Sequence, residues 1–94
     1  MVNASRASLE SRLDNWGNAA RGPYDAIDAA KIEAAWRRLE PRHKELLRMV
    51  YLWHAGREVV CRRLRIPRHP RSHYDLELAA TQRALARQLE KGTT

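Results

Sequence analysis

Apolar residues recur at spacings of three and four along nearly the whole chain, and this periodicity constrains the fold more than any other feature. Such spacing places side chains on one face of an α-helix, whereas a half-buried strand alternates apolar and polar residues. No stretch of strand length alternates in that way, and the sequence has no glycine-rich loop and no internal repeat. The sequence therefore predicts an all-α fold, a small helical bundle of about five helices.

Capping and helix-breaking residues divide this pattern into three parts of one domain. We expect an N-terminal helix within residues 5–22, central helices within residues 25–56 and a basic helix-turn-helix within residues 57–90. A chain of 94 residues can bury one modest core and has no room for a second domain. Residues 1–94 are therefore expected to form a single helical domain.

Individual residues set the expected helix ends. Ser5 or Ser8 can cap the first helix, and Asp25 can cap the second, because their side-chain oxygens can accept hydrogen bonds from free backbone N–H groups. Pro41 fits the first turn of a third helix, where no N–H is needed, and Gly56 suits a C-terminal cap of that helix.

The apolar face of each helix is expected to contribute to the core. Trp16, Trp36 and Trp53 lie on or beside these faces, so we expect each ring to be buried and to supply much of the stability of so small a domain. The faces are formed by Leu9, Leu13, Trp16 and Ala20; by Ala29, Ile32, Trp36 and Leu39; by His43, Leu46, Leu47, Val50 and His54; and by Leu78, Gln82, Leu85 and Leu89.

Two prolines separate the last two helical segments. Pro67 and Pro70 cannot lie inside a continuing helix, because each lacks a backbone N–H and restricts the residue before it. The turn is therefore expected at residues 66–71. A short helix over about residues 57–65 precedes it, and a long helix over about residues 73–90 follows it.

The residues around this turn have the order of a helix-turn-helix. The short helix is expected to turn Val60 inward and Arg62 and Arg63 outward. Ser72 and Asp75, three residues apart, form a variant of the capping box at the start of the last helix. A short basic helix, a tight turn and a capped helix in this order are typical of a helix-turn-helix that reads DNA.

Positive charge is concentrated in the same region. The net charge of the chain is +7, and residues 1–40 carry six basic and six acidic side chains, so the whole excess lies in residues 41–94. Residues 57–73 hold six arginines against Glu58 alone, before either histidine is counted. Such a local field suits phosphate groups. A solvated arginine-rich face without a partner is the alternative interpretation.

The basic turn lies where a recognition helix meets DNA. The first turn of that helix points into the major groove, where its free N–H groups and dipole favour phosphate, and the preceding loop lies against the backbone. An arginine there can hold a phosphate, or guanine O6 and N7, with two hydrogen bonds. The candidate DNA-binding residues are Arg57, Arg62, Arg63, Arg65, Arg68, His69, Arg71, Ser72, His73 and Tyr74.

Two segments also resemble a known family. "LDNWGNAARG", and later "LEPRHKELLRMVYLWHAGREVVCRRLRIP" with "YDLELAATQRALARQL", resemble the phage antitermination protein Q family of phage 21-type lambdoid phages. The second segment is also similar to the helix-turn-helix of region 4 of bacterial sigma factors. The stretch at residues 67–71 is longer than the turn of sigma region 4, so base-reading positions are not transferred from sigma factors.

The resemblance implies a phage transcription regulator, not an enzyme. Such a protein binds double-stranded DNA near a late promoter, engages bacterial RNA polymerase at a promoter-proximal pause and makes it resistant to downstream terminators. By this resemblance Arg62, Arg63, Arg68, Arg71 and His73 face DNA. The alternative is an interaction protein that binds RNA polymerase without sequence-specific DNA recognition, its basic turn contacting the enzyme or the nascent RNA. The oligomeric state stays open.

Composition disfavours several other kinds of protein. No apolar run approaches the ~18 residues of a membrane span, and the N-terminus lacks the layout of a secretory signal. We therefore expect a cytoplasmic protein that has no membrane partner, and the resemblance to a phage family implies that this is the cytoplasm of a bacterial host. The single cysteine, Cys61, has no partner for an internal disulfide and is expected to be a buried apolar residue.

Metal and nuclease sites are also disfavoured. His43 and His54 stand about three helical turns apart, and His69 and His73 lack a nearby cysteine or carboxylate partner, so we expect no metal site and no cofactor. The carboxylates of Asp75 and Glu77 could suggest a nuclease accessory, which is the weakest alternative. Hydrolysis of DNA needs a cluster of carboxylates on a metal, so we expect no catalytic residues.

Overall fold

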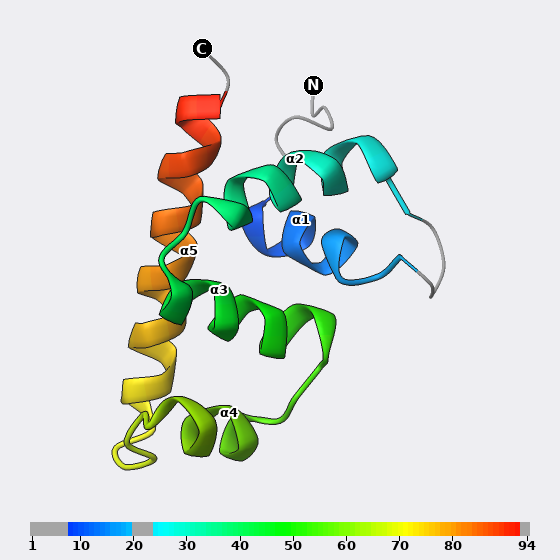
Figure 1. Cartoon of the computed structure of the whole chain (residues 1–94). Coiled ribbons are helices and arrows are strands. Elements are labelled where there is room, and N and C mark those ends of the chain that lie inside the picture. The colour runs from blue at the N-terminus through cyan, green and yellow to red at the C-terminus, as the bar shows by residue number, and fades with distance from the viewer. Residues whose placement is uncertain (1–7, 20–23, 93–94) are drawn as a thin grey trace.

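The computed structural model describes residues 8–19 and 24–92, and all regular secondary structure in these residues is helical (Figure 1). The prediction of a small all-α bundle of about five helices is therefore confirmed. The elements are α1 (Leu9–Trp16), α2 (Ala26–Arg37), α3 (Pro41–Leu47), the π-helical segment η2 (Arg48–Leu52), α4 (Arg57–Leu64) and α5 (Ser72–Gly92).

The long helix α5 is the element that joins the two ends of the molecule. Figure 1 shows it running along one side, with α4 near its N-terminal end, α3 beside its middle and α2 near its C-terminal end. The pair α1 and α2 packs together, and both α2 and α3 pack against α5. One face of α5 therefore covers the bundle, and the opposite face is left open to solvent.

Local capping holds the α1–α2 pair as the sequence predicts. The Ser8 side chain accepts a hydrogen bond from the backbone N–H of Ser11 (3.1 Å), and Asp25 accepts one from that of Asp28 (3.0 Å). The Asn15 amide group both donates to the carbonyl oxygen of Asp25 (2.9 Å) and accepts from its N–H (2.8 Å). These bonds fix the end of α1 against the start of α2.

The first helix is shorter than the predicted N-terminal helix of residues 5–22. It ends at Trp16, and Gly17 is its C-cap, with an N–H that donates to the carbonyl oxygen of Leu13 (3.0 Å). The backbone of Tyr51 lies directly against Gly17, a tertiary contact that nothing in the local sequence announces. Ser5, the alternative cap, and the predicted helix end at Ala20 lie outside the described residues.

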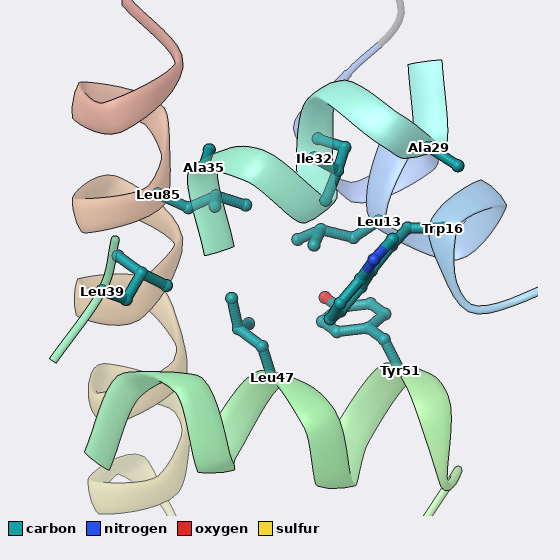
Figure 2. Close-up of a cluster of buried hydrophobic side chains, with 9 residues drawn as sticks. All are labelled: Leu13, Trp16, Ala29, Ile32, Ala35, Leu39, Leu47, Tyr51 and Leu85. Carbon is teal, nitrogen blue, oxygen red and sulfur yellow. The ribbon is translucent and has the colours of Figure 1, made fainter. Parts of the chain in front are cut away.

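Two clusters of buried side chains form the core. Figure 2 shows the first, in which side chains from α1, α2, α3, η2 and α5 point toward one another. Its members are Leu13, Trp16, Ala29, Ile32, Ala35, Leu39, Leu47, Tyr51 and Leu85. The second cluster fills the space around α4 and consists of Leu46, Met49, Val60, Cys61 and Ile66. Cys61 is buried in it, as predicted.

A polar network closes one side of the first cluster. The Tyr51 hydroxyl donates to Oε2 of Glu10 (3.0 Å), while Nε2 of Gln82 donates to Oε1 of Glu10 and to the Tyr51 hydroxyl (both 2.9 Å). Burial raises the pKa of the Tyr51 phenol well above its ordinary value, and the Glu10 carboxylate raises it further. The phenol therefore stays protonated and ties α1, η2 and α5 together.

The prediction that Trp53 is buried is wrong, because its side chain is 53% exposed. The backbone N–H of Trp53 donates to the carbonyl oxygen of Arg48 (2.9 Å), five residues earlier, which is a π-helical bond. The wider π turn rotates the residues that follow it about the helix axis, so Trp53 points away from the core that the buried Leu47 and Tyr51 face. Trp16 is buried as predicted, and Trp36 is partly buried beside it.

The predicted C-cap at Gly56 is also wrong. The chain leaves the helical path at His54, which has a φ of 53°, and the N–H of Ala55 then donates to the carbonyl oxygen of Met49 (2.8 Å). Gly56 has an ordinary extended conformation and is the N-cap of α4. After the π turn, the residue with the left-handed backbone conformation is therefore His54, two positions before the glycine that the sequence predicted as the cap.

We expect His54→Gly to stabilise the protein by up to about 1 kcal/mol, because glycine adopts a positive φ without the steric cost borne by a residue with a Cβ. Urea denaturation followed by circular dichroism measures this change. Ala55→Gly is the matched control: Ala55 does not have a positive φ, so that substitution should lower stability. A loss of stability in His54→Gly would contradict the assignment.

Candidate nucleic-acid interface

The segment predicted to be a helix-turn-helix consists of α4, a connection at residues 65–71 and α5. Arg65 ends α4 in a left-handed conformation (φ 58°), and the N–H of Ile66 donates to the carbonyl oxygen of Cys61 (2.9 Å). Ile66 is buried, whereas every residue from position 67 to 73 is exposed. The predicted turn at residues 66–71 is therefore confirmed, anchored by Ile66 and otherwise open to solvent.

The predicted capping box of Ser72 and Asp75 is not formed. Ser72 is already the first residue of α5, and the hydrogen bonds of the described residues include none from its hydroxyl. The helix starts instead on backbone turns, in which the N–H groups of His73 and Tyr74 donate to the carbonyl oxygens of Pro70 and Arg71 (both 3.2 Å). The carboxylate of Asp75 is engaged elsewhere, by Arg57.

Two arginines hold α4 and α5 in their relative positions. Nη2 of Arg57 donates to Oδ1 of Asp75 (3.2 Å). Arg42, at the start of α3, donates from Nη1 to the carbonyl oxygen of Leu64 (2.7 Å) and from Nε to Oε1 of Glu77 (3.2 Å). These contacts fix both ends of the connection, and they also neutralise two carboxylates on α5.

Tyr74 and Arg57 were predicted to contact DNA, but the structure gives both a role inside the fold. Tyr74 is partly buried against the second core cluster, and the Arg57 guanidinium lies 4.8 Å from the centre of its ring. Burial raises the pKa of the Tyr74 phenol, against the opposing effect of the Arg57 charge. Nη1 of Arg57 is buried as well, so this arginine is directed into the molecule.

The other predicted arginines fall into two groups. Nε of Arg63 lies 3.4 Å from Oε2 of Glu45, and Nη1 of Arg68 lies 4.0 Å from Oε1 of Glu58. Arg62, Arg65 and Arg71 are exposed, and within the described part of the chain no ion pair involves them. The remaining predicted residues, His69, Ser72 and His73, are exposed beside them.

The structure adds a row of residues that the sequence analysis missed. Leu76, Ala80, Arg83 and Arg87 lie four, three and four residues apart, on the face of α5 opposite the buried Leu85. Both arginines are exposed, and neither is paired with another described residue. The sequence contains this signal, since these four residues recur at the same spacing of three and four as the buried leucines of α5, but on the opposite face of the helix.

These observations define a basic face of five exposed and unpaired arginines within the described residues: Arg62, Arg65, Arg71, Arg83 and Arg87. Arg62 lies on α4, Arg65 and Arg71 lie in the connection, and Arg83 and Arg87 lie on the outer side of α5. The neighbouring carboxylates Asp75, Glu77 and Glu58 each face an arginine, so they subtract little from the field. A surface of this kind attracts a polyanion.

The described residues show neither a metal-binding cluster nor a helix that could span a membrane. They contain no group of three His, Cys, Asp or Glu side chains that could hold a metal ion. None of the helices in residues 8–19 and 24–92 is both long and apolar enough to span a bilayer. Comparison of the chain with protein-family models, with curated proteins and with solved structures finds no match.

Proposed function

We propose that this protein is a transcription regulator that binds double-stranded DNA through α4, the connection and α5. The observation that carries the proposal is the basic face, whose five arginines have no ion pair among the described residues and surround a helix-turn-helix. An arginine paired inside the fold would have to exchange partners to bind phosphate, whereas these five would not. Their guanidinium groups are therefore available to DNA.

The arrangement suits the docking of α5 in the major groove. Arg71 and the exposed Ser72 and His73 lie at the N-terminal end of α5, the end that contacts base edges in helix-turn-helix proteins. Arg62 on α4 would reach phosphate on one side. Arg83 follows Arg71 by twelve residues, about 18 Å along the helix at a rise of ~1.5 Å per residue, and would reach the backbone further along.

Together with the resemblance to the phage antitermination Q family, this leads to a more specific proposal. The protein binds DNA near a phage late promoter in the cytoplasm of a bacterial host, and it modifies the host RNA polymerase so that transcription continues past terminators. Conversion of the polymerase requires a second surface. The exposed apolar side chains Leu52, Trp53 and Val59 lie outside the basic face and supply candidates for it.

The proposal is tested by fluorescence anisotropy on a duplex selected from a random-sequence library and on a scrambled duplex of equal composition. We expect tighter binding of the selected duplex at physiological salt. Arg71→Ala, at a base-reading position, should cost about 1–3 kcal/mol mainly on the selected duplex, while Arg62→Ala should weaken both alike. Lys31→Ala, exposed on α2, is the matched control and should change neither.

Equal affinity of the wild-type protein for both duplexes would refute sequence-specific binding. The alternative of an RNA polymerase-binding protein without DNA recognition would then be favoured by one further result. Arg68→Ala and Arg71→Ala would leave the affinity for DNA unchanged and abolish the capture of purified RNA polymerase. Magnesium-dependent cleavage of plasmid DNA by the pure protein would favour a nuclease accessory instead.

A further inference from the structure

Leu76 is the one large apolar side chain on the outward face of α5, and it is 66% exposed. The other leucines of α5 are partly or fully buried: Leu78 and Leu89 pack against the core, and Leu85 is completely enclosed. The described part of the chain gives Leu76 no core role, yet the residues around it on the same face are polar or small. Packing in the core therefore does not account for a leucine at this position.

The surface beside Leu76 is hollowed. A depression of about 190 Å³ lies between α5 and the connection, lined by Leu76, Ile66, Pro67 and His73 and by the Arg42–Glu77 ion pair. Ile66 and Pro67 make part of the lining apolar. A small apolar group could therefore contact Leu76 and lose its water without burying an unpaired charge.

The position of Leu76 places it among the residues that would contact base edges. It follows Ser72, the first residue of α5, by four residues, so it lies on the same face about one turn, or ~5.4 Å, further along the helix. The outward side chains of this first part of a recognition helix contact bases in the major groove. The next outward residue, Ala80, is small, so it lets α5 approach the bases closely.

We propose that Leu76 is a specificity-determining residue that contacts the C5-methyl group of a thymine in the major groove. This inference rests on the proposed DNA-binding function and names part of the sequence that is read. The thymine methyl is the apolar group that base pairs present in the major groove, and apolar side chains recognise it. His73, three residues before Leu76, and Arg71, directly before α5, would bind neighbouring polar edges or phosphates.

The test uses the selected duplex and replaces each thymine in turn by deoxyuridine, which lacks only the methyl group. Burial of one methyl contributes about 0.8 kcal/mol, which corresponds to an approximately fourfold change in Kd. With the wild-type protein, deoxyuridine at one position should weaken binding about fourfold. With Leu76→Ala, the thymine duplex should be weakened by a similar factor, and the same deoxyuridine substitution should have no further effect.

Two controls accompany these binding measurements on wild type and Leu76→Ala. Ile27→Ala removes an exposed aliphatic side chain from α2 and should leave the discrimination between thymine and deoxyuridine unchanged. Thermal unfolding of Leu76→Ala should match that of the wild type, since the side chain is mostly exposed. If Leu76→Ala discriminates thymine from deoxyuridine as the wild type does, or if no selected thymine shows the effect, the inference is overturned.

Failure of the inference differs from failure of the proposed function. A wild-type protein that prefers the selected duplex but tolerates every deoxyuridine overturns only the role of Leu76. A wild-type protein that binds selected and scrambled duplexes equally overturns both. Loss of RNA polymerase binding in Leu76→Ala, with DNA binding unchanged, would instead assign Leu76 to a protein contact and overturn the methyl contact.

Discussion

Replacing Gly17 with alanine is expected to destabilise the protein by about 3 kcal/mol, enough to unfold much of so small a domain. An alanine Cβ at this position would overlap the carbonyl oxygen of Tyr51 and lie 2.7 Å from its carbonyl carbon. Both atoms belong to the backbone, so no change of rotamer relieves the overlap. Tyr51 is held from its other end by Glu10 and Gln82, so η2 cannot easily move away.

The measurement is urea denaturation, with the folded fraction followed by circular dichroism. Gly56→Ala is the matched control, because a Cβ there meets no atom within 4 Å, and its cost should stay below about 1 kcal/mol, the usual effect at an N-cap. Similar losses at Gly17 and Gly56 would show that the first glycine is not constrained by the contact with Tyr51.

Gly17 also shows why only part of this fold could be predicted. Helix starts depend on neighbours in sequence, so Ser8, Asp25 and Pro41 could be assigned from the local pattern. The end of α1 depends on Tyr51, which is distant in the sequence. The π turn at Arg48–Leu52 depends on packing as well, and it leaves Trp53 exposed where the sequence predicted a buried ring. Local signals therefore predicted where helices begin better than where they end.

The candidate site, like the fold, could be predicted from the sequence only in part. Composition could show that arginines crowd residues 57–73, but it could not show which of them are neutralised within the fold. The partner of Arg57 is Asp75, and the carbonyl oxygen and carboxylate held by Arg42 belong to α4 and α5. Pairings across helices depend on tertiary geometry. Arg83 and Arg87, by contrast, could have been found from their spacing alone.

The distinction between paired and unpaired arginines has a large expected effect on the salt dependence of DNA binding. Four phosphate contacts, one from each arginine of the basic face other than the base-reading Arg71, predict that log affinity falls with log salt with a slope of about −3.6. Between ~50 and ~200 mM salt, the affinity should then fall about 150-fold. Arg62→Gln with Arg83→Gln removes two contacts, so the slope should change to about −1.8 and the loss to about 12-fold.

A second double variant removes the same charge from another surface. Lys31 and Arg38 are exposed on α2 and at its C-terminal end, outside the basic face, so Lys31→Gln with Arg38→Gln should leave the slope near about −3.6. Affinity measured by anisotropy on one duplex over a salt series gives all three slopes. If both double variants lower the slope equally, the protein attracts DNA by its net charge of +7 and not through a defined face. If only Arg62→Gln with Arg83→Gln lowers it, the arginines of the basic face are the ones that bind phosphate.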